Sequence, residues 1–463
     1  MVHPAPIRYI PTAPMSSRTE SLQHAARTLD VAATIDSARV GSLQREVILL
    51  CFLISMLDGF DTQAIAFAAP ALAARWHVPL SAFGPIFSAS LLGSMFGVAI
   101  GGRLADRYGR RWLTIGTVAL FAVATLACAG ADSVHSLIAY RFVAGLGLGG
   151  VIPNFMSLAA EFAPQRLRAT VVAWTLWGFP LGAVAGGALS VALTARYGAA
   201  AVFILGGLTP LLLTPLLIAR LPESIRWLLM SNGRQEQARR LLLRIAPTLR
   251  LEQNTVLVLH EPARPANPLR AIFTGELAPR TFLFAGAMLM SLLLSYLLVT
   301  WIPLLLRQSG LNQGAAIAGT VVFNLAGIVG SVFFTRGVDQ GSRPLRLMVW
   351  IFCMSAAAVA SIGLVGTRLW AVMGSIFVAG FLLLGIQMTL SAFIVGNYPT
   401  ALRATAIGWI QAAGRLGSLL GPLFAGLLLS LGTPLPWIFA ICGLPALFAA
   451  GALAMLTRLT VSK

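Results

Sequence analysis

The chain has 463 residues, of which 57% are hydrophobic and only 10% are charged, and its formal net charge is +18 at pH 7. Soluble domains carry about 25% charged residues, so this composition excludes a soluble enzyme of several domains and favours a membrane protein. The positive charge does not predict nucleic-acid binding, because the basic residues lie in short runs between long apolar stretches instead of clustering on one soluble face.

Residues 1–45 precede the first apolar stretch, lack the apolar core of a secretory signal and carry five arginines. They are predicted to form a segment that stays in the cytoplasm. The four cysteines fall inside apolar stretches, without a CxxC pair or a histidine at ligand spacing. They are expected to be buried and inert, and neither a metal nor another cofactor is predicted.

Apolar stretches long enough to cross a bilayer, about 20 residues each, recur through the rest of the chain. The stretch 416–457 is long enough for two helices, and residues 432–436, with two prolines, supply the break between them. An all-α membrane protein with twelve transmembrane helices is predicted, at 47–72, 82–101, 113–131, 136–161, 169–192, 200–219, 280–306, 313–335, 347–366, 369–394, 404–429 and 435–456.

Basic residues divide unevenly between the two sides of this arrangement. The N-terminus and the loops on its side hold 27 of the 33 Arg and Lys residues, and the opposite loops hold four. Because cytoplasmic loops are enriched in Arg and Lys, both termini are predicted to be cytoplasmic. The long connection 221–278 carries apolar residues at helical spacing beside arginines, which predicts short amphipathic helices on the inner leaflet; a cargo-binding role is the alternative.

An internal repeat indicates duplication. Residues 164–170 with Trp174 recur as residues 399–405 with Trp409, and six residues match at one offset of 235. Both copies follow an even-numbered helix, so the repeat is parallel and predicts two six-helix bundles. The predicted organisation is a cytoplasmic segment at 1–45, a bundle at 46–220, a central loop at 221–278, a second bundle at 279–457 and a cytoplasmic tail at 458–463.

Several motifs resemble one family. Residues 102–111, GRLADRYGRR, are similar to the inner loop between the second and third helices of the major facilitator superfamily, and residues 221–228 resemble the end of its sixth helix. Within the superfamily, Leu57-Asp58-Gly59-Phe60-Asp61, the glycine-rich stretch after Arg141 and residues 29–36 look like the aromatic acid:proton symporter family. Because residues 1–14 precede the family-like stretch, a true start at Met15 is a further hypothesis.

The resemblance implies proton-coupled uptake of an aromatic carboxylic acid, such as hydroxybenzoate, across the bacterial inner membrane by alternating access. It implies no enzyme activity and no cofactor beyond the coupling proton, with the bilayer and the substrate as partners and a monomer as the working unit. Proton-antiport efflux of drugs or metabolites, and uptake of another organic acid or a sugar, remain alternatives on the same fold.

Two carboxyls lie inside the first predicted helix. Asp58 and Asp61 fall near mid-bilayer, where ionisable groups are costly and are functional candidates. Three residues apart, they share one face of the helix, and Gly59 leaves that face open. Repulsion between two neighbouring carboxylates makes the pair a candidate proton carrier; the alternative is a structural role as hydrogen-bonded acids.

Two arginines also lie within predicted helices. Arg415 falls deep in the eleventh helix, and its planar guanidinium suits a carboxylate. It is predicted to clamp the substrate anion; a permanent pair with Asp58, or packing alone, is the alternative. Arg141 lies near the outer end of the fourth helix and either extends outward to the interface or draws anions into the cavity.

A ring-shaped substrate needs aromatic walls and a few hydrogen-bond partners. The side chains that could supply them are also those common at membrane interfaces, so lipid-facing or packing roles remain open. The candidates are Trp174, Trp177, Tyr296, Trp301, Asn324 and Gln387.

Charged residues gather at the cytoplasmic ends of helices two to four. The resemblance implies that they form an ion-pair latch that closes the inner side, with arginines of the repeated loops as partners; the alternative is that they only reflect the excess of basic residues on that side. The predicted gating residues are Asp106, Arg110, Arg111, Glu161, Arg168 and Arg403.

Overall fold

A computed structural model describes residues 28–38, 40–231, 233–247, 249, 255–258, 268–340, 344–365 and 368–461. The choice between Met1 and Met15 as the start lies outside these residues. Twelve helices of the described chain are long and apolar enough to cross a membrane, as predicted. They are α2 (Ser42–Trp76), α3 (Phe83–Tyr108), α4 (Arg110–Ala129), α5 (Val134–Phe162), α6 (Gln165–Tyr197), α7 (Ala200–Arg220), α11 (Leu277–Gln308), α12 (Gln313–Gln340), α13 (Pro344–Ile362), α14 (Leu369–Gly396), α15 (Thr400–Ser430) and the paired segments α16 (Leu435–Cys442) and α17 (Leu444–Val461).

Most of these helices are longer than predicted. Helix α2 begins five residues before the apolar stretch and has 35 residues, because polar residues such as Gln44 continue the helical hydrogen bonding beyond the apolar stretch. The predicted last helix is divided between α16 and α17 at Gly443, which packs against the main chain of Ala356.

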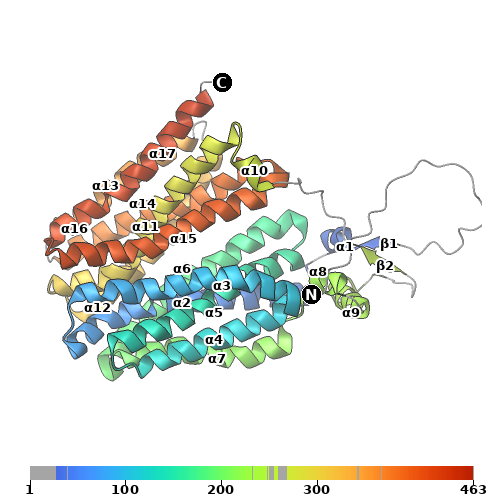
Figure 1. The fold of residues 1–463 in the computed structure, drawn as a ribbon, viewed down its shortest axis with the longest axis horizontal. Coiled ribbons are helices and arrows are strands. Elements are labelled where there is room, and N and C mark those ends of the chain that lie inside the picture. Colours follow the sequence, from blue (N-terminus) through green and yellow to red (C-terminus); the bar gives the residue numbers. More distant parts are fainter. Residues whose placement is uncertain are drawn as a thin grey trace, which may run out of the picture.

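Figure 1 shows the helices in two groups, α2–α7 and α11–α17, which meet at one end and diverge toward the end that carries α1 (Val31–Ser37), α8 (Ile225–Met230) and α9 (Gln235–Ile245). We call the end with α1, α8 and α9 the loop side and the opposite end the far side. The far side carries the short helix η1 (Leu80–Ala82). Between the groups, α6 packs on α12, α3 on α15 and α2 on α11.

The loop side also contains a feature that the all-helical prediction missed. Strand β1 (Thr28–Asp30) pairs in parallel with β2 (Val256–Val258), so the segment before the first membrane helix is joined to the central loop. After that loop, α10 (Pro268–Ile272) packs on α15.

The short helices of the central loop exist, but their predicted contact with lipid is wrong. The apolar face of α9, including Ala238, Leu242 and Ile245, is buried in one core with α1, α8 and α2. Because this core already removes that face from water, the helix gains nothing by turning it toward the membrane.

Glycines set the close contacts between helices. A Cβ added at Gly145 or Gly149 of α5 would lie 2.0 Å from the carbonyl oxygen of Ser90 or Ser94 in α3. Gly59 behaves likewise: its added Cβ would lie 1.9 Å from the carbonyl oxygen of Phe179. The expectation that Gly59 leaves an open face is therefore wrong, because α6 fills that space.

We expect Gly149→Leu to destabilise the first bundle by more than the 1–3 kcal/mol typical of overpacking, because backbone is less able than a side chain to move aside. Gly116→Leu is the matched control, since no other atom lies within 4 Å of a Cβ added there. Thermal unfolding of both purified variants in detergent measures the difference. Equal melting temperatures would contradict the assigned contact between α3 and α5.

Candidate functional site

Asp58 of α2 is buried at the interface between the two bundles. The Thr62 hydroxyl donates to its Oδ1 at 3.4 Å, and Arg415 of α15 is the cation that acts on it electrostatically. Arg415 also acts electrostatically on Tyr296 of α11. The structure thus brings an acid, a guanidinium and a phenol together from three helices of both bundles.

Asp58 and Arg415 do not form a direct ion pair among the described residues. The alternative in which Arg415 is the permanent partner of Asp58 is therefore not realised in this conformation. Arg415 is partly exposed, and the planar guanidinium of an arginine suits a carboxylate.

Asp61 lies in different surroundings from Asp58. Its carboxylate is fully buried inside the first bundle, where Arg141 of α5 pairs with it at 3.2 Å and the Thr125 hydroxyl of α4 donates to it. Arg141 also donates to the main-chain oxygen of Asp61 at 3.1 Å and to the hydroxyl of Ser90 at 3.3 Å.

The outward orientation of Arg141 is thus wrong, since its side chain is 0% exposed. In hydrocarbon, a neutralising partner and three acceptors stabilise a guanidinium that would otherwise have to reach water. The two acids also do not form one isolated pair: Asp58 faces the second bundle and Asp61 is neutralised within the first.

We expect Arg141→Leu to lower the free energy of unfolding by about 3–5 kcal/mol, because it leaves Asp61 buried without a partner. The double variant Arg141→Leu with Asp61→Leu should recover most of this loss. Thermal unfolding of the two single variants and the double variant forms the cycle. Additive losses would show that the pair is not coupled.

Asn324 of α12 lies between the bundles, but its amide has a protein partner. Asn324 Nδ2 donates to Gln63 Oε1 at 3.0 Å and Gln63 Nε2 donates to Asn324 Oδ1 at 3.2 Å. Both side chains are buried, at 3% and 0% exposure. In this conformation the predicted substrate contact of Asn324 is replaced by a link between α2 and α12. Sequence reasoning missed Gln63, although it lies two residues after Asp61 in the same apolar stretch.

The other residues predicted to contact the substrate's aromatic ring lie in different regions of the structure. Gln387 of α14 is partly buried and accepts a hydrogen bond from Ser295 of α11, within the second bundle. Trp177 stacks on Trp174 with ring centroids 6.4 Å apart. Trp301 is fully buried, packs edge-on against Phe87 and donates to the Pro422 carbonyl at 3.1 Å, so it joins the bundles and lines no open site.

The predicted latch on the loop side is built within one bundle. Arg110 of α4 pairs with Glu161 of α5, which also accepts from the Ser224 hydroxyl at 2.6 Å. Arg168 is exposed and, like Arg403, takes part in no ion pair among the described residues. Their predicted role as partners of the latch therefore stays a prediction: no ion pair joins them to it in this conformation, and Arg403 belongs to the second bundle, which diverges from the first on this side.

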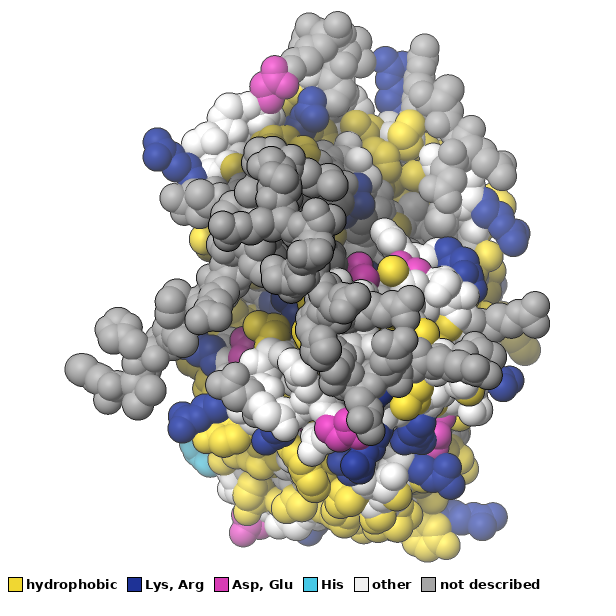
Figure 2. Space-filling view, turned by 90° about the vertical axis from the view of Figure 1, so that its right-hand side faces the viewer, with side chains coloured by type: hydrophobic (Ala, Val, Ile, Leu, Met, Phe, Trp, Pro, Cys, Tyr) yellow, Lys and Arg dark blue, Asp and Glu magenta, His cyan; other side chains and the backbone are white. Residues whose placement is uncertain are grey.

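Asp106 and Arg111 take part in hydrogen bonds within the first bundle and the loop side, and none of their bonds among the described residues reaches the second bundle. The indole nitrogen of Trp227 donates to the main-chain oxygen of Asp106 at 2.9 Å, and Arg111 donates to the carbonyl of Ile218 at 2.6 Å. Figure 2 looks onto the loop side and shows arginine side chains spread around this face.

Glu223 was left without a role by sequence reasoning and proves to cap α4. Its carboxylate accepts from the main-chain nitrogens of Arg110 and Arg111 at 2.8 and 3.0 Å. Gly109 makes this approach possible: its φ is +94°, and a Cβ there would lie 2.3 Å from the Glu223 carboxylate. A carboxylate at a helix N-terminus is stabilised by the free N–H groups and the helix dipole.

Among solved structures, the fold resembles a bacterial homologue of the lysosomal transporter Spinster in an inward-facing conformation, with a TM-score of 0.69 and 15% identity, covering 92% of this chain and 99% of that one. It also resembles a D-xylose–proton symporter, with a TM-score of 0.66 and 20% identity, covering 88% of this chain and 97% of that one. At these identities the likeness shows the fold alone.

Curated proteins give a more specific comparison. The chain is 34% identical to the 4-hydroxybenzoate transporter PcaK of Pseudomonas aeruginosa, covering 92% of this chain and 96% of the relative. It is 34% identical to the gallate transporter of Pseudomonas putida, covering 91% and 94%, and 29% identical to the benzoate transport protein of Acinetobacter baylyi, covering 91% of each.

The predicted resemblance to aromatic-acid transporters is thereby confirmed. Transport, and no enzymatic reaction, is the activity of the family and of these relatives. Twelve membrane-spanning helices and bacterial relatives of this kind make the chain a multi-pass inner-membrane protein. Residues 51–389 match the family model described as Major Facilitator Superfamily, and the chain belongs to this superfamily of transporters.

Proposed function

We propose that the protein takes up an aromatic carboxylic acid together with protons, acting as a monomer by alternating access. The observation that carries the proposal is Asp58, a buried acid without a direct ion pair, facing Arg415 and Tyr296 across the bundle interface. The printed activities of the relatives, transport of 4-hydroxybenzoate, gallate and benzoate, support the substrate class.

Arg415 binds the substrate carboxylate in this proposal, because its planar guanidinium can donate two parallel hydrogen bonds to it. The hydroxyl of Tyr296, which lies within the electrostatic reach of Arg415, donates or accepts at the same carboxylate or at a ring hydroxyl. Three other predicted substrate contacts now bind or stack on protein side chains. They line the site only in conformations in which these interactions are broken; the three are Gln387, Asn324 and Trp177.

Protonation of Asp58 couples the two ligands. A charged Asp58 and the substrate carboxylate compete for electrostatic attraction to Arg415. When Asp58 is protonated and neutral, Arg415 is available to bind the substrate anion. A monoanion entering against an inside-negative potential costs about 2.3 kcal/mol per 100 mV, and one accompanying proton removes this cost.

The excess of arginine on the loop side supports a cytoplasmic location for that side and for both termini. In this orientation the structure is closed toward the outside by contacts between the bundles. Ser88 of α3 donates to the Leu419 carbonyl of α15 at 2.9 Å, and Gln63 and Asn324 link α2 to α12. The Arg110–Glu161 cluster, Asp106, Arg111, Arg168 and Arg403 then form the inner gate, which assembles when the bundles approach on the loop side.

Uptake of labelled 4-hydroxybenzoate, gallate and benzoate by cells that express the chain tests the proposal. We expect accumulation that a protonophore abolishes, with cells carrying an empty vector as the control. Accumulation that is indifferent to the protonophore contradicts proton coupling. Faster loss of preloaded acid from expressing cells would indicate export instead.

A further inference from the structure

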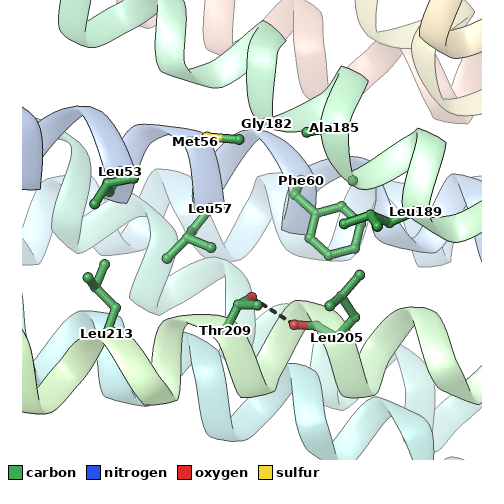
Figure 3. A pocket seen from close by; sticks show the side chains of 11 residues that line it. Leu53, Met56, Leu57, Phe60, Gly182, Ala185, Leu189, Leu205, Thr209 and Leu213 are labelled. Carbon is green, nitrogen blue, oxygen red and sulfur yellow. Dashed lines mark hydrogen bonds between the residues drawn. The ribbon is translucent and has the colours of Figure 1, made fainter.

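A cavity of about 300 Å³ lies in the first bundle, away from Asp58 and Arg415. Figure 3 shows side chains of α2 and α7 pointing toward one another across it, with α6 alongside. Its lining from these two helices is Leu53, Met56, Leu57, Phe60, Leu205, Thr209 and Leu213.

The lining contains no cationic side chain and no free hydrogen-bond donor that could bind an anionic substrate. Its one hydroxyl, on Thr209, already donates to the Leu205 carbonyl at 2.7 Å, as the dashed line in Figure 3 marks. Burying a carboxylate against such a wall would be costly, because nothing replaces its hydration. An apolar occupant is the one that this cavity fits.

The cavity lies on the side of α2 that faces away from the second bundle. Leu53, Leu57 and Phe60 follow helical spacing on one face, and Asp58 points to the opposite face, toward Arg415. At its rim, Leu189 of α6 is 53% exposed. All three walls belong to membrane-spanning helices, so the surrounding medium is the acyl chains of the bilayer.

The cavity exists because α6 and α7 pack differently on α2. A Cβ at Gly182 would lie 1.7 Å from the Met56 carbonyl oxygen, which shows that α6 touches the main chain of α2. Helices α6 and α7 make far fewer contacts with each other than α6 makes with α2. A groove therefore remains between α6 and α7.

Two arginines lie at the loop-side end of the same groove. Arg45 precedes Leu53 by eight residues on α2, and Arg220 follows Leu213 by seven on α7, which places both about 10–12 Å along the helices from the groove. Arg220 is exposed and pairs with Glu46 at 3.2 Å. Arg45 is exposed and has no ion-pair partner among the described residues, so the charges of Arg45, Glu46 and Arg220 at this end of the two helices sum to a net positive charge.

This spacing matches a phospholipid. Each leaflet contributes about 15 Å of hydrocarbon, so a phosphate held by arginine at the helix ends has its chains at the depth of the groove. Arginine donates to phosphate through two N–H groups at once, which favours an anionic headgroup over one whose charge is already neutralised.

We propose that the groove between α2, α6 and α7 binds one acyl chain of an anionic phospholipid whose phosphate lies on Arg45 and Arg220. The chain contacts Leu57 and Phe60, which flank Asp58 and Gly59 in the sequence, so the bound lipid supports the position of the helix that carries the acid. This binding is independent of the proposed substrate.

Native mass spectrometry of the purified full chain, with dioleoylphosphatidylglycerol or dioleoylphosphatidylcholine added, tests the site. Leu213→Trp fills the groove, and Leu212→Trp is the matched control, because Leu212 is 67% exposed on the neighbouring position and does not line it. We expect Leu213→Trp to weaken phosphatidylglycerol binding about tenfold, equivalent to the lost burial of two methylenes, and Leu212→Trp to leave it unchanged.

The headgroup contact is tested separately with the double variant Arg45→Gln and Arg220→Gln. The control is Arg458→Gln, which removes an exposed arginine from the loop-side end of α17. The double variant should lose the preference for phosphatidylglycerol over phosphatidylcholine, and the control should keep it. Equal binding of the two lipids by the unaltered chain, or equal effects of the two tryptophan variants, overturns the proposal. Neither readout depends on transport, so failure of the proposed function would leave the result intact.

Discussion

Replacing Asp58 by asparagine is expected to end proton-driven accumulation of the aromatic acid while exchange of acid across the membrane continues. Asparagine keeps the size and polarity of the side chain but can no longer carry a proton across. At an inside-negative potential of about 100 mV, an anion that moves without its proton is held about fiftyfold below the level reached by electroneutral entry. Accumulation of labelled 4-hydroxybenzoate and counterflow in proteoliposomes measure the two activities.

Asp132→Asn is the control for this variant, because Asp132 is an exposed acid just before the far-side start of α5 and its carboxylate accepts a hydrogen bond from Ser136. It should accumulate substrate like the unaltered chain. Accumulation by Asp58→Asn that still collapses with a protonophore would contradict the assignment of the proton to this residue. Loss of counterflow together with accumulation would indicate damage to the substrate site instead.

We expect Asp58, and not Asp61, to carry the proton, and this difference follows from the partners of the two acids. Asp61, Arg141 and Thr125 form a buried, internally neutral group within one bundle, which moves as part of that bundle. Asp58 faces a guanidinium of the opposite bundle, so its surroundings change whenever the bundles move relative to each other. An acid whose environment depends on the conformation can load and release a proton in step with the transport cycle.

The sequence predicted the fold well because its signals can be read along the chain without knowing which helices pack together. Apolar stretches gave twelve helices, and the repeat at an offset of 235 gave two bundles. The position of Asp58, Asp61 and Arg415 within membrane helices also followed from counting residues along each stretch. Helix ends were less well predicted, since polar residues extend a helix once its hydrogen bonding is established.

Pairing between helices could not be predicted in the same way. The choice of Asp61 as the partner of Arg141 depends on the rotation of α2 and α5 about their axes, and 80 residues separate the two. The amides of Gln63 and Asn324 are 261 residues apart and meet only because the bundles touch at that depth. The partner of Glu161 depends on conformation, because a latch between bundles cannot form while their loop-side ends are apart.

The contact between the two bundles on the far side can be locked by a disulfide, which is expected to have a large effect on uptake. Gly84 of α3 and Gly426 of α15 face each other across the two bundles: a Cβ added at either would lie 3.2–3.4 Å from the Cα of the other. The two main chains are thus closer than a disulfide needs, since its Cβ atoms lie about 3.5–4.5 Å apart, and a small outward shift of the helix ends lets cysteines at these positions bond. We expect oxidised Gly84→Cys with Gly426→Cys to lose uptake, because a crosslink here prevents the far side from opening.

Reduction of the disulfide should restore uptake by the same preparation, and each single cysteine variant should be insensitive to the oxidant. The native cysteines do not compete, since three are buried and Cys353 is partly buried. Thiol labelling before and after oxidation reports how much crosslink has formed. A fully crosslinked protein that still accumulates substrate would mean that the bundles need not separate at α3 and α15, and alternating access by rocking of the two bundles would then be the wrong mechanism.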